Sequence, residues 1–264
     1  MNRRIIVIVS FLVLALMSSG TAVSLASPTP DPKKNKKQGK TDPLLAQSLI
    51  RQAYSFMQQQ RYEEALESFH QAEAANPGNA TIYNMMGLCY MSTDRIDQAL
   101  ENFDTALRMI PGFTDARNNR GTAYLALEQY HLAEVDFIAV LSDSTYPHRW
   151  KVFYNLGLTY LGRGQVGAAE ENFTKAITAT VPVFEAYLRL AEIAVSQGRN
   201  DSALSLLEEA HFKFPERLDG ILAYGRLLVQ MGRMEEARPY LQDVVVSDPG
   251  SQLAAEARAL LANP

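Results

Sequence analysis

The chain has 264 residues, 47% of them hydrophobic, and its 25 basic and 29 acidic side chains give a formal net charge of −4. Its one cysteine, Cys89, excludes an internal disulfide. The first 43 residues hold seven of the basic and two of the acidic residues, so the remainder carries 18 basic and 27 acidic side chains, a net charge of −9. An acidic body without a basic stripe argues against nucleic acid as a partner.

Residues 1–26 have the order of a secretory signal peptide. Arg3 and Arg4 precede an uncharged apolar run of 13 residues, Ile5–Met17, and the small residues Ser24 and Ala26 stand at the minus-three and minus-one positions of a cleavage site. The run is short for a bilayer span, which needs about 20 residues. The sequence therefore predicts an exported protein, periplasmic or secreted, that begins at residue 27.

Residues 27–43 are predicted to form a disordered tether. They are rich in Pro, Lys and Asp, with five lysines between Lys33 and Lys40, and cannot bury a core. A solvated spacer is the favoured interpretation, and contact with anionic lipid, cell wall or nucleic acid is the alternative. Because no charge follows the apolar run until Asp31, an uncleaved, membrane-anchored form stays open. Membrane contact is expected only through such an anchor or through the tether, since the cysteine of a lipoprotein is missing after the apolar run.

Residues 46–251 contain six copies of one pattern. In the copy at 80–113, apolar residues recur at three- and four-residue steps around Gly87 and again around Ala99, which predicts two helices. The turn at 93–95 separates them and Pro111 follows the second. The repeats are bounded at 46–79, 80–113, 114–149, 150–183, 184–217 and 218–251.

The small and large residues of the pattern keep their places in every copy. Successive small residues of the first helix are 34, 34, 36, 34 and 34 residues apart, at Ala53, Gly87, Gly121, Gly157, Ala191 and Gly225. The second helix carries a small residue at Ala65, Ala99, Ala133, Ala169, Ala203 and Ala237, and a large one at Phe69, Phe103, Phe137, Phe173, Leu207 and Leu241. Small residues are expected where the two helices of a copy approach closely, with the large ones filling the space around that contact.

This 34-residue pattern resembles the tetratricopeptide repeat (TPR). The resemblance implies an all-α fold, a right-handed α-solenoid of six helical hairpins, which presents a surface and carries no chemistry of its own. Residues 252–264 are predicted to end the solenoid with a capping helix, since 252–262 are amphipathic, with Leu253, Ala257, Leu260 and Leu261 on one side.

Residues suited to catalysis, metal binding or cofactor binding are not found in a recognisable arrangement. The four histidines, at 70, 131, 148 and 211, lie in different repeats and form no i, i+4 pair. The sequence shows no glycine-rich phosphate loop, nucleophile elbow or histidine-based triad signature. We therefore expect a protein that is not an enzyme and that has no cofactor and no metal.

The resemblance implies that the first helices line a concave groove where a peptide or helix of a partner protein binds. With packing residues at repeat positions 4, 7, 8 and 11, positions 2, 5, 9 and 12 are left for that groove. Position 12 is apolar in all six repeats, and an exposed apolar strip marks a partner site. The alternative is that packing between repeats hides part of it. The predicted groove residues are Asn84, Leu88, Met91, Asn118, Leu125, Tyr154, Leu158, Leu161 and Leu188.

The third repeat departs most from the pattern. Arg117 and Arg120 occupy positions that are normally apolar, and we expect their stems to pack while their guanidinium groups reach water. The two extra residues fall at 144–150, which includes Trp150, the only tryptophan. Tryptophan is enriched at binding hot spots. Filling a widened joint between repeats is the alternative role.

In its layout, an exported chain of six repeats with a capping helix, the protein resembles the pilotin-like TPR proteins of type IV pilus systems. These assist assembly and docking of the outer-membrane secretin ring. Those proteins are typically lipoproteins, and this chain lacks the lipidated cysteine. A general periplasmic adaptor for cell-wall or envelope enzymes is the alternative.

Export predicts a processed N-terminus. Mass spectrometry of the protein from the periplasm or medium should show a chain that begins at Ser27, because the charged start, apolar run and small-residue site occur in order. A chain that keeps Met1 in the membrane fraction would support the anchored form instead.

Overall fold

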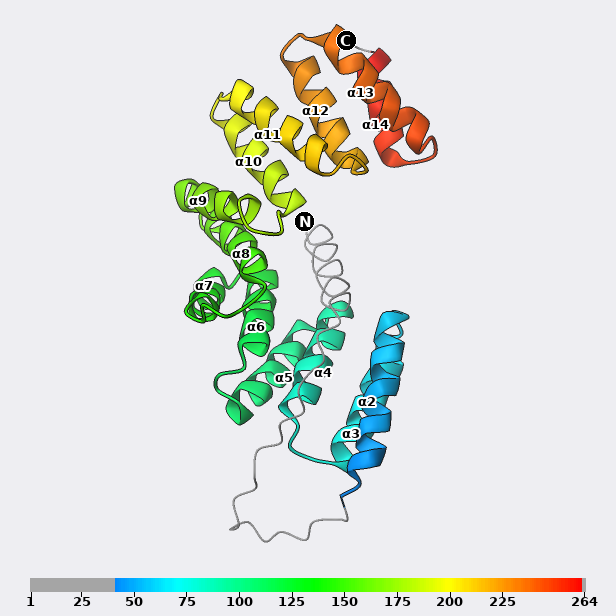
Figure 1. The fold of residues 1–264 in the computed structure, drawn as a ribbon, viewed down its shortest axis with the longest axis vertical. Coiled ribbons are helices and arrows are strands. Elements are labelled where there is room, and N and C mark those ends of the chain that lie inside the picture. Colours follow the sequence, from blue (N-terminus) through cyan, green and yellow to red (C-terminus); the bar gives the residue numbers. More distant parts are fainter. Residues whose placement is uncertain (1–40, 263–264) are drawn as a thin grey trace. The chain divides into compact units, whose positions relative to one another are not determined.

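The computed structural model describes residues 41–262, so the predicted signal peptide and nearly all of the predicted tether lie outside the described residues. The chain divides after Tyr146 into two compact units, here called unit 1 and unit 2 (Figure 1). The described residues form thirteen α-helices and no strand, which confirms the all-α repeat fold. None of these helices is both long enough and apolar enough to span a bilayer.

Unit 1 contains three helical hairpins. Their helices are α2 (Pro43–Gln58) with α3 (Tyr62–Ala75), α4 (Ala80–Ser92) with α5 (Ile96–Met109), and α6 (Thr114–Ala126) with α7 (Tyr130–Leu141). The second helix of each hairpin also packs on the first helix of the next one, as α3 does on α4 and α5 on α6. The first described helix begins at Pro43, the last residue assigned to the tether. Asp42 caps it by accepting a hydrogen bond from the Leu45 amide.

Unit 2 repeats this arrangement and adds one helix. Its hairpins are α8 (Arg149–Gly162) with α9 (Val166–Ile177), α10 (Phe184–Ser196) with α11 (Asn200–Lys213), and α12 (Leu218–Gln230) with α13 (Met234–Ser247). The last helix, α14 (Gln252–Ala262), packs on α12 and α13 and buries Ala254 and Ala257 against them. The predicted capping helix is therefore present, and it covers the end of the last hairpin.

The core of each hairpin is the contact between a small residue of the first helix and a large residue of the second. A methyl group at Gly157 would come within 2.5 Å of the Phe173 ring, and one at Gly121 within 2.8 Å of the Phe137 ring. These phenylalanines are fully buried, as are the six alanines of the second helices. The helices can approach this closely only because no side chain stands between them.

The turn inside each hairpin uses the same backbone conformation. One residue per turn has a positive φ, and these residues follow the repeat spacing, at Gln60, Asp94, Glu128, Gly164, Gly198 and Gly232. Glycine adopts this left-handed region without strain, whereas other residues pay about 1–2 kcal/mol there. The three hairpins of unit 1 thus carry strained turns, and the three of unit 2 do not.

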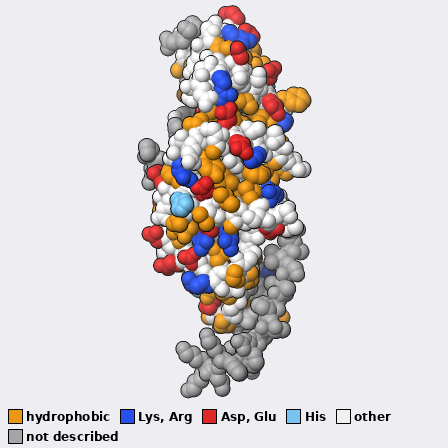
Figure 2. Space-filling view, turned by 90° about the vertical axis from the view of Figure 1, so that its left-hand side faces the viewer, with side chains coloured by type: hydrophobic (Ala, Val, Ile, Leu, Met, Phe, Trp, Pro, Cys, Tyr) orange, Lys and Arg blue, Asp and Glu red, His pale blue; other side chains and the backbone are white. Residues whose placement is uncertain are grey.

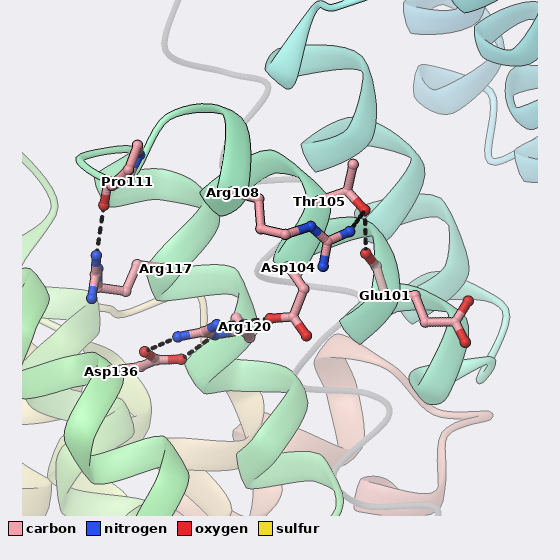
Figure 3. Close-up of polar contacts among 8 residues, drawn as sticks. All are labelled: Glu101, Asp104, Thr105, Arg108, Pro111, Arg117, Arg120 and Asp136. Carbon is pink, nitrogen blue, oxygen red and sulfur yellow. Dashed lines mark hydrogen bonds and ion pairs between the residues drawn. The ribbon is translucent and has the colours of Figure 1, made fainter.

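Arg120 on α6 joins three helices of unit 1 (Figure 3). Its guanidinium donates to both oxygens of Asp136 on α7, over 2.8 and 2.7 Å, and to Asp104 on α5 over 2.7 Å. Asp136 is 2% exposed, so this is a largely buried ion pair, and the pKa of Arg120 is raised chiefly by the hydrogen bonds that it donates to Asp136. The sequence predicted a guanidinium group that reaches water; the Arg120 side chain is 23% exposed, and its guanidinium group is paired with a buried carboxylate. Arg117 instead donates to the exposed carbonyl of Pro111, 2.6 Å away.

Substitutions at two glycines of the fourth hairpin test helix packing and turn geometry separately. Gly157→Leu should lower the melting temperature strongly, because the side chain would meet the buried Phe173 ring, and overpacking costs about 1–3 kcal/mol or more. Gly164→Leu should have the smaller effect of a strained φ in open space. Gly167→Leu, with open space on the outside of α9, is the control and should change little. Equal shifts for the first two variants would contradict the packing register.

The buried ion pair predicts an asymmetric effect of two substitutions. Arg120→Met should destabilise unit 1 by about 3–5 kcal/mol, because it leaves the Asp136 carboxylate buried without its cation. Asp104→Asn should cost less than about 1 kcal/mol, because that carboxylate is 40% exposed. Chemical unfolding curves of the two variants measure the difference, and a mild effect of Arg120→Met would show that the pair is not needed.

Candidate protein-binding face

The predicted groove residues of unit 1 are buried. Asn84, Leu88 and Met91 on α4, and Asn118 and Leu125 on α6, are each at most 8% exposed. The reason is that α4 and α6 pack directly on each other. The Asn119 side-chain amide donates to Asn84 Oδ1 over 2.9 Å, in a buried hydrogen bond between the two helices. The expectation that these five side chains face solvent is wrong, because contacts between neighbouring first helices occupy them.

Unit 2 keeps part of the predicted face accessible. Tyr154 is buried against Phe173, with ring centroids 5.7 Å apart, and this burial raises the pKa of its hydroxyl to about 12. The solvent-facing prediction is therefore wrong for Tyr154 as well. Leu158, Leu161 and Leu188, however, are only half-buried.

The accessible apolar residues of unit 2 lie at repeat positions 5, 9 and 12 of its first helices. At repeat position 12, Val195 on α10 is 37% exposed and Val229 on α12 is half-buried. We call the set of Leu158 and Leu161 on α8, Leu188 and Val195 on α10, and Val229 on α12 the α8–α12 face. Three of these residues, Leu161, Val195 and Val229, share position 12, and apolar residues that recur on successive first helices can contact one apolar partner segment, such as the stripe of an amphipathic helix.

Charged residues accompany the α8–α12 face. Arg189 pairs with the exposed Glu192 on α10 over 2.7 Å, and Arg226 on α12 pairs with Glu256 on α14. These pairs leave the apolar positions next to charges of both signs. A partner that binds here therefore needs an apolar stripe more than a particular net charge.

Cys89 and the histidines show no arrangement for catalysis. Cys89 is fully buried on α4, and burial raises the pKa of its thiol to about 12, so the thiolate needed for reactivity is not formed at neutral pH. Within residues 41–262, no group of three or more His, Cys, Asp or Glu side chains is placed to hold a metal ion. The arrangement of the described residues offers surfaces for contact, and no catalytic set.

Trp150 lies at the start of α8 and is half-buried. Its ring makes an edge contact with His148, with centroids 6.5 Å apart, and the Lys151 ammonium lies 4.9 Å from its centroid. Whether Trp150 contacts a partner stays a prediction.

Sequence reasoning missed the apolar residues that are exposed on second helices. Val135 on α7, Phe212 on α11 and Val246 on α13 are 53%, 85% and 75% exposed. A comparison of one repeat position across all six copies would have revealed them, because the other copies carry mainly polar residues there. The resemblance to the TPR pattern instead predicted that partner-binding residues lie on the first helices.

Comparison with protein-family models gives matches to two tetratricopeptide repeat models. One matches residues 50–112, 85–147 and 154–217, and the other matches residues 194–263. These matches cover most of the helices described above. The chain belongs to the tetratricopeptide repeat family. A search of curated proteins found no match.

Several solved structures share this TPR fold. PilW, described as a widely conserved type IV pilus biogenesis factor, is 22% identical with a TM-score of 0.71, over 80% of this chain and 97% of PilW. PilF of Pseudomonas aeruginosa is 20% identical with a TM-score of 0.68, over 82% of this chain and 97% of PilF. YrrB, a TPR protein described as having an unusual peptide-binding site, is 23% identical with a TM-score of 0.52, over 74% and 99%. At these identities the likeness shows the fold.

Proposed function

We propose that this TPR protein is a non-catalytic scaffold that binds a partner protein through the α8–α12 face. The observation that carries the proposal is the row of partly exposed apolar residues on α8, α10 and α12, where a residue without a partner would be expected to be polar. In unit 1, position 12 is buried in all three hairpins, and the equivalent apolar residues of α4 and α6 are buried by contacts within that unit. Binding is therefore assigned to unit 2.

The partner is proposed to belong to a type IV pilus or secretin assembly, or to another envelope complex, with the protein acting after export. Support comes from the similarity of the fold to PilW and PilF over nearly the whole length of those proteins. The predicted signal peptide also supports the proposal, because export would bring the protein to the same part of the cell as such machinery. A general periplasmic adaptor for cell-wall or envelope enzymes is the second candidate, because the TPR fold is shared by proteins with other partners.

The contrast between Leu158 and Leu156 tests the α8–α12 face. Leu158→Asp should abolish partner capture with little change in circular dichroism or melting temperature, because the half-buried position tolerates a charge that the complex would desolvate. Leu156→Asp should unfold the hairpin, because Leu156 is 3% exposed inside it. Crosslinking in intact cells, followed by purification of the wild type and each variant, measures capture.

Two results would contradict this assignment. If Leu158→Asp unfolds the protein, the α8–α12 face is core and offers no partner site. If the folded variant captures the same proteins as the wild type, binding occurs elsewhere. Recovery of a secretin with the wild type, and its loss with Leu158→Asp, would favour the pilus role over the general adaptor.

A further inference from the structure

The outer face of α7 differs from that of every other second helix. Leu132, Val135 and Ile138, here called the α7 stripe, are 44%, 53% and 49% exposed. At the position of Val135 the other repeats carry Glu67, Glu101, Glu171, Ser205 and Pro239, and at the position of Ile138 they carry His70, Asp104, Thr174, Glu208 and Gln242. The same backbone position thus accepts polar residues elsewhere, so folding does not require the apolar ones here.

The exposed residues of α7 are the α7 stripe and His131, so this face exposes no acidic side chain and no lysine or arginine. Of the two acidic residues of α7, Asp136 is buried and accepts hydrogen bonds from Arg120, and Glu134 is half-buried. The second helix of the preceding hairpin, α5, instead exposes Asp97 and Glu101. Figure 2 shows hydrophobic side chains at the surface on the side where α7 lies in Figure 1. Three adjacent aliphatic residues on an uncharged helix face form a patch of the kind that contacts another protein.

We propose that the α7 stripe is a self-association surface through which two copies of this chain form a two-fold symmetric dimer. A two-fold contact brings the same patch of both copies together, so the patch must be complementary to itself. A neutral apolar stripe meets this condition, whereas a charged patch repels its own copy. The helical body has a net charge of −9, and contact through a face without exposed acidic side chains adds no close like-charge pair to the repulsion between two copies.

The size of the α7 stripe sets the strength of the dimer. A stable interface buries roughly 800 Å² on each partner, and three half-exposed side chains provide less than half of that. The dimer is therefore weak and forms at high local concentration. Val135 is the middle residue of the stripe, three residues from each of the others, so it lies nearest the two-fold axis. The α7 stripe shares no residue with the α8–α12 face, so a substitution in one leaves the residues of the other unchanged.

Disulfide trapping of the full chain tests this placement. Cys89 is buried with a raised thiol pKa, so Val135→Cys introduces the one reactive thiol of the described residues. Under a mild oxidant it should form a covalent dimer about ten times faster than Ser205→Cys, because two thiols near a two-fold axis can reach bonding distance. Ser205 is a matched control, since it is exposed at the same repeat position on α11. Equal rates for the two variants would overturn the proposal.

Sedimentation equilibrium up to about 1 mM protein gives an independent test without a new thiol. The wild type should shift from monomer to dimer as the concentration rises, and Val135→Glu should shift at least tenfold less. The variant should fold normally, because repeats one, two and four carry glutamate at this position. Phe212→Ser, which removes an exposed apolar residue outside the α7 stripe, should associate like the wild type. A wild type that stays monomeric, or a Val135→Glu variant that associates equally, would overturn the proposal.

Discussion

The close approach of two helices within each hairpin is the contact on which the rest of the fold depends. Gly157 lies directly on the Phe173 ring, and Gly87 and Gly121 meet their own phenylalanines in the same way. Each of these fully buried rings contributes about 1.5–3 kcal/mol by leaving water. The contact also sets the rotation of each helix about its axis. Once the small residue faces the ring, each remaining side chain of the helix faces either the neighbouring hairpin or solvent.

This assignment differs between the two units. In unit 1, α4 and α6 pack on each other, and Leu88, Met91 and Leu125 are buried. In unit 2, the same repeat positions include Leu158, Leu161 and Val195, which keep part of their surface in contact with water. The same repeat position can therefore be buried in one hairpin of the solenoid and accessible to solvent in another. Here the difference leaves unit 2 as the part suited to a partner.

Charge placement shows how the third hairpin tolerates residues that break the repeat. Arg120 takes a position that is apolar in four of the other five copies, and Asp136 on the facing helix neutralises it. Compared with apolar packing, a buried ion pair adds little to the free energy of unfolding, and it requires the two charged groups to be held in a precise geometry. The pairing also places the Asp136 side chain of α7 in the core, and the exposed residues of that helix include no acidic side chain. One helix, α7, thus carries both the buried ion pair of this hairpin and its exposed apolar residues.

The sequence alone determined the hairpins, their register and the capping helix. A small residue must recur wherever two helices touch, and this requirement is local enough to be read from spacings such as that from Gly87 to Gly121. The sequence could not determine which residues of the first helices reach solvent. Asn84 and Leu158 look equally exposed by position, yet Asn84 accepts a hydrogen bond from Asn119 on another helix while Leu158 stays accessible. Contacts between hairpins decide that outcome, because they depend on the distance between helices that are 34 residues apart in the chain, and only the tertiary structure gives that distance.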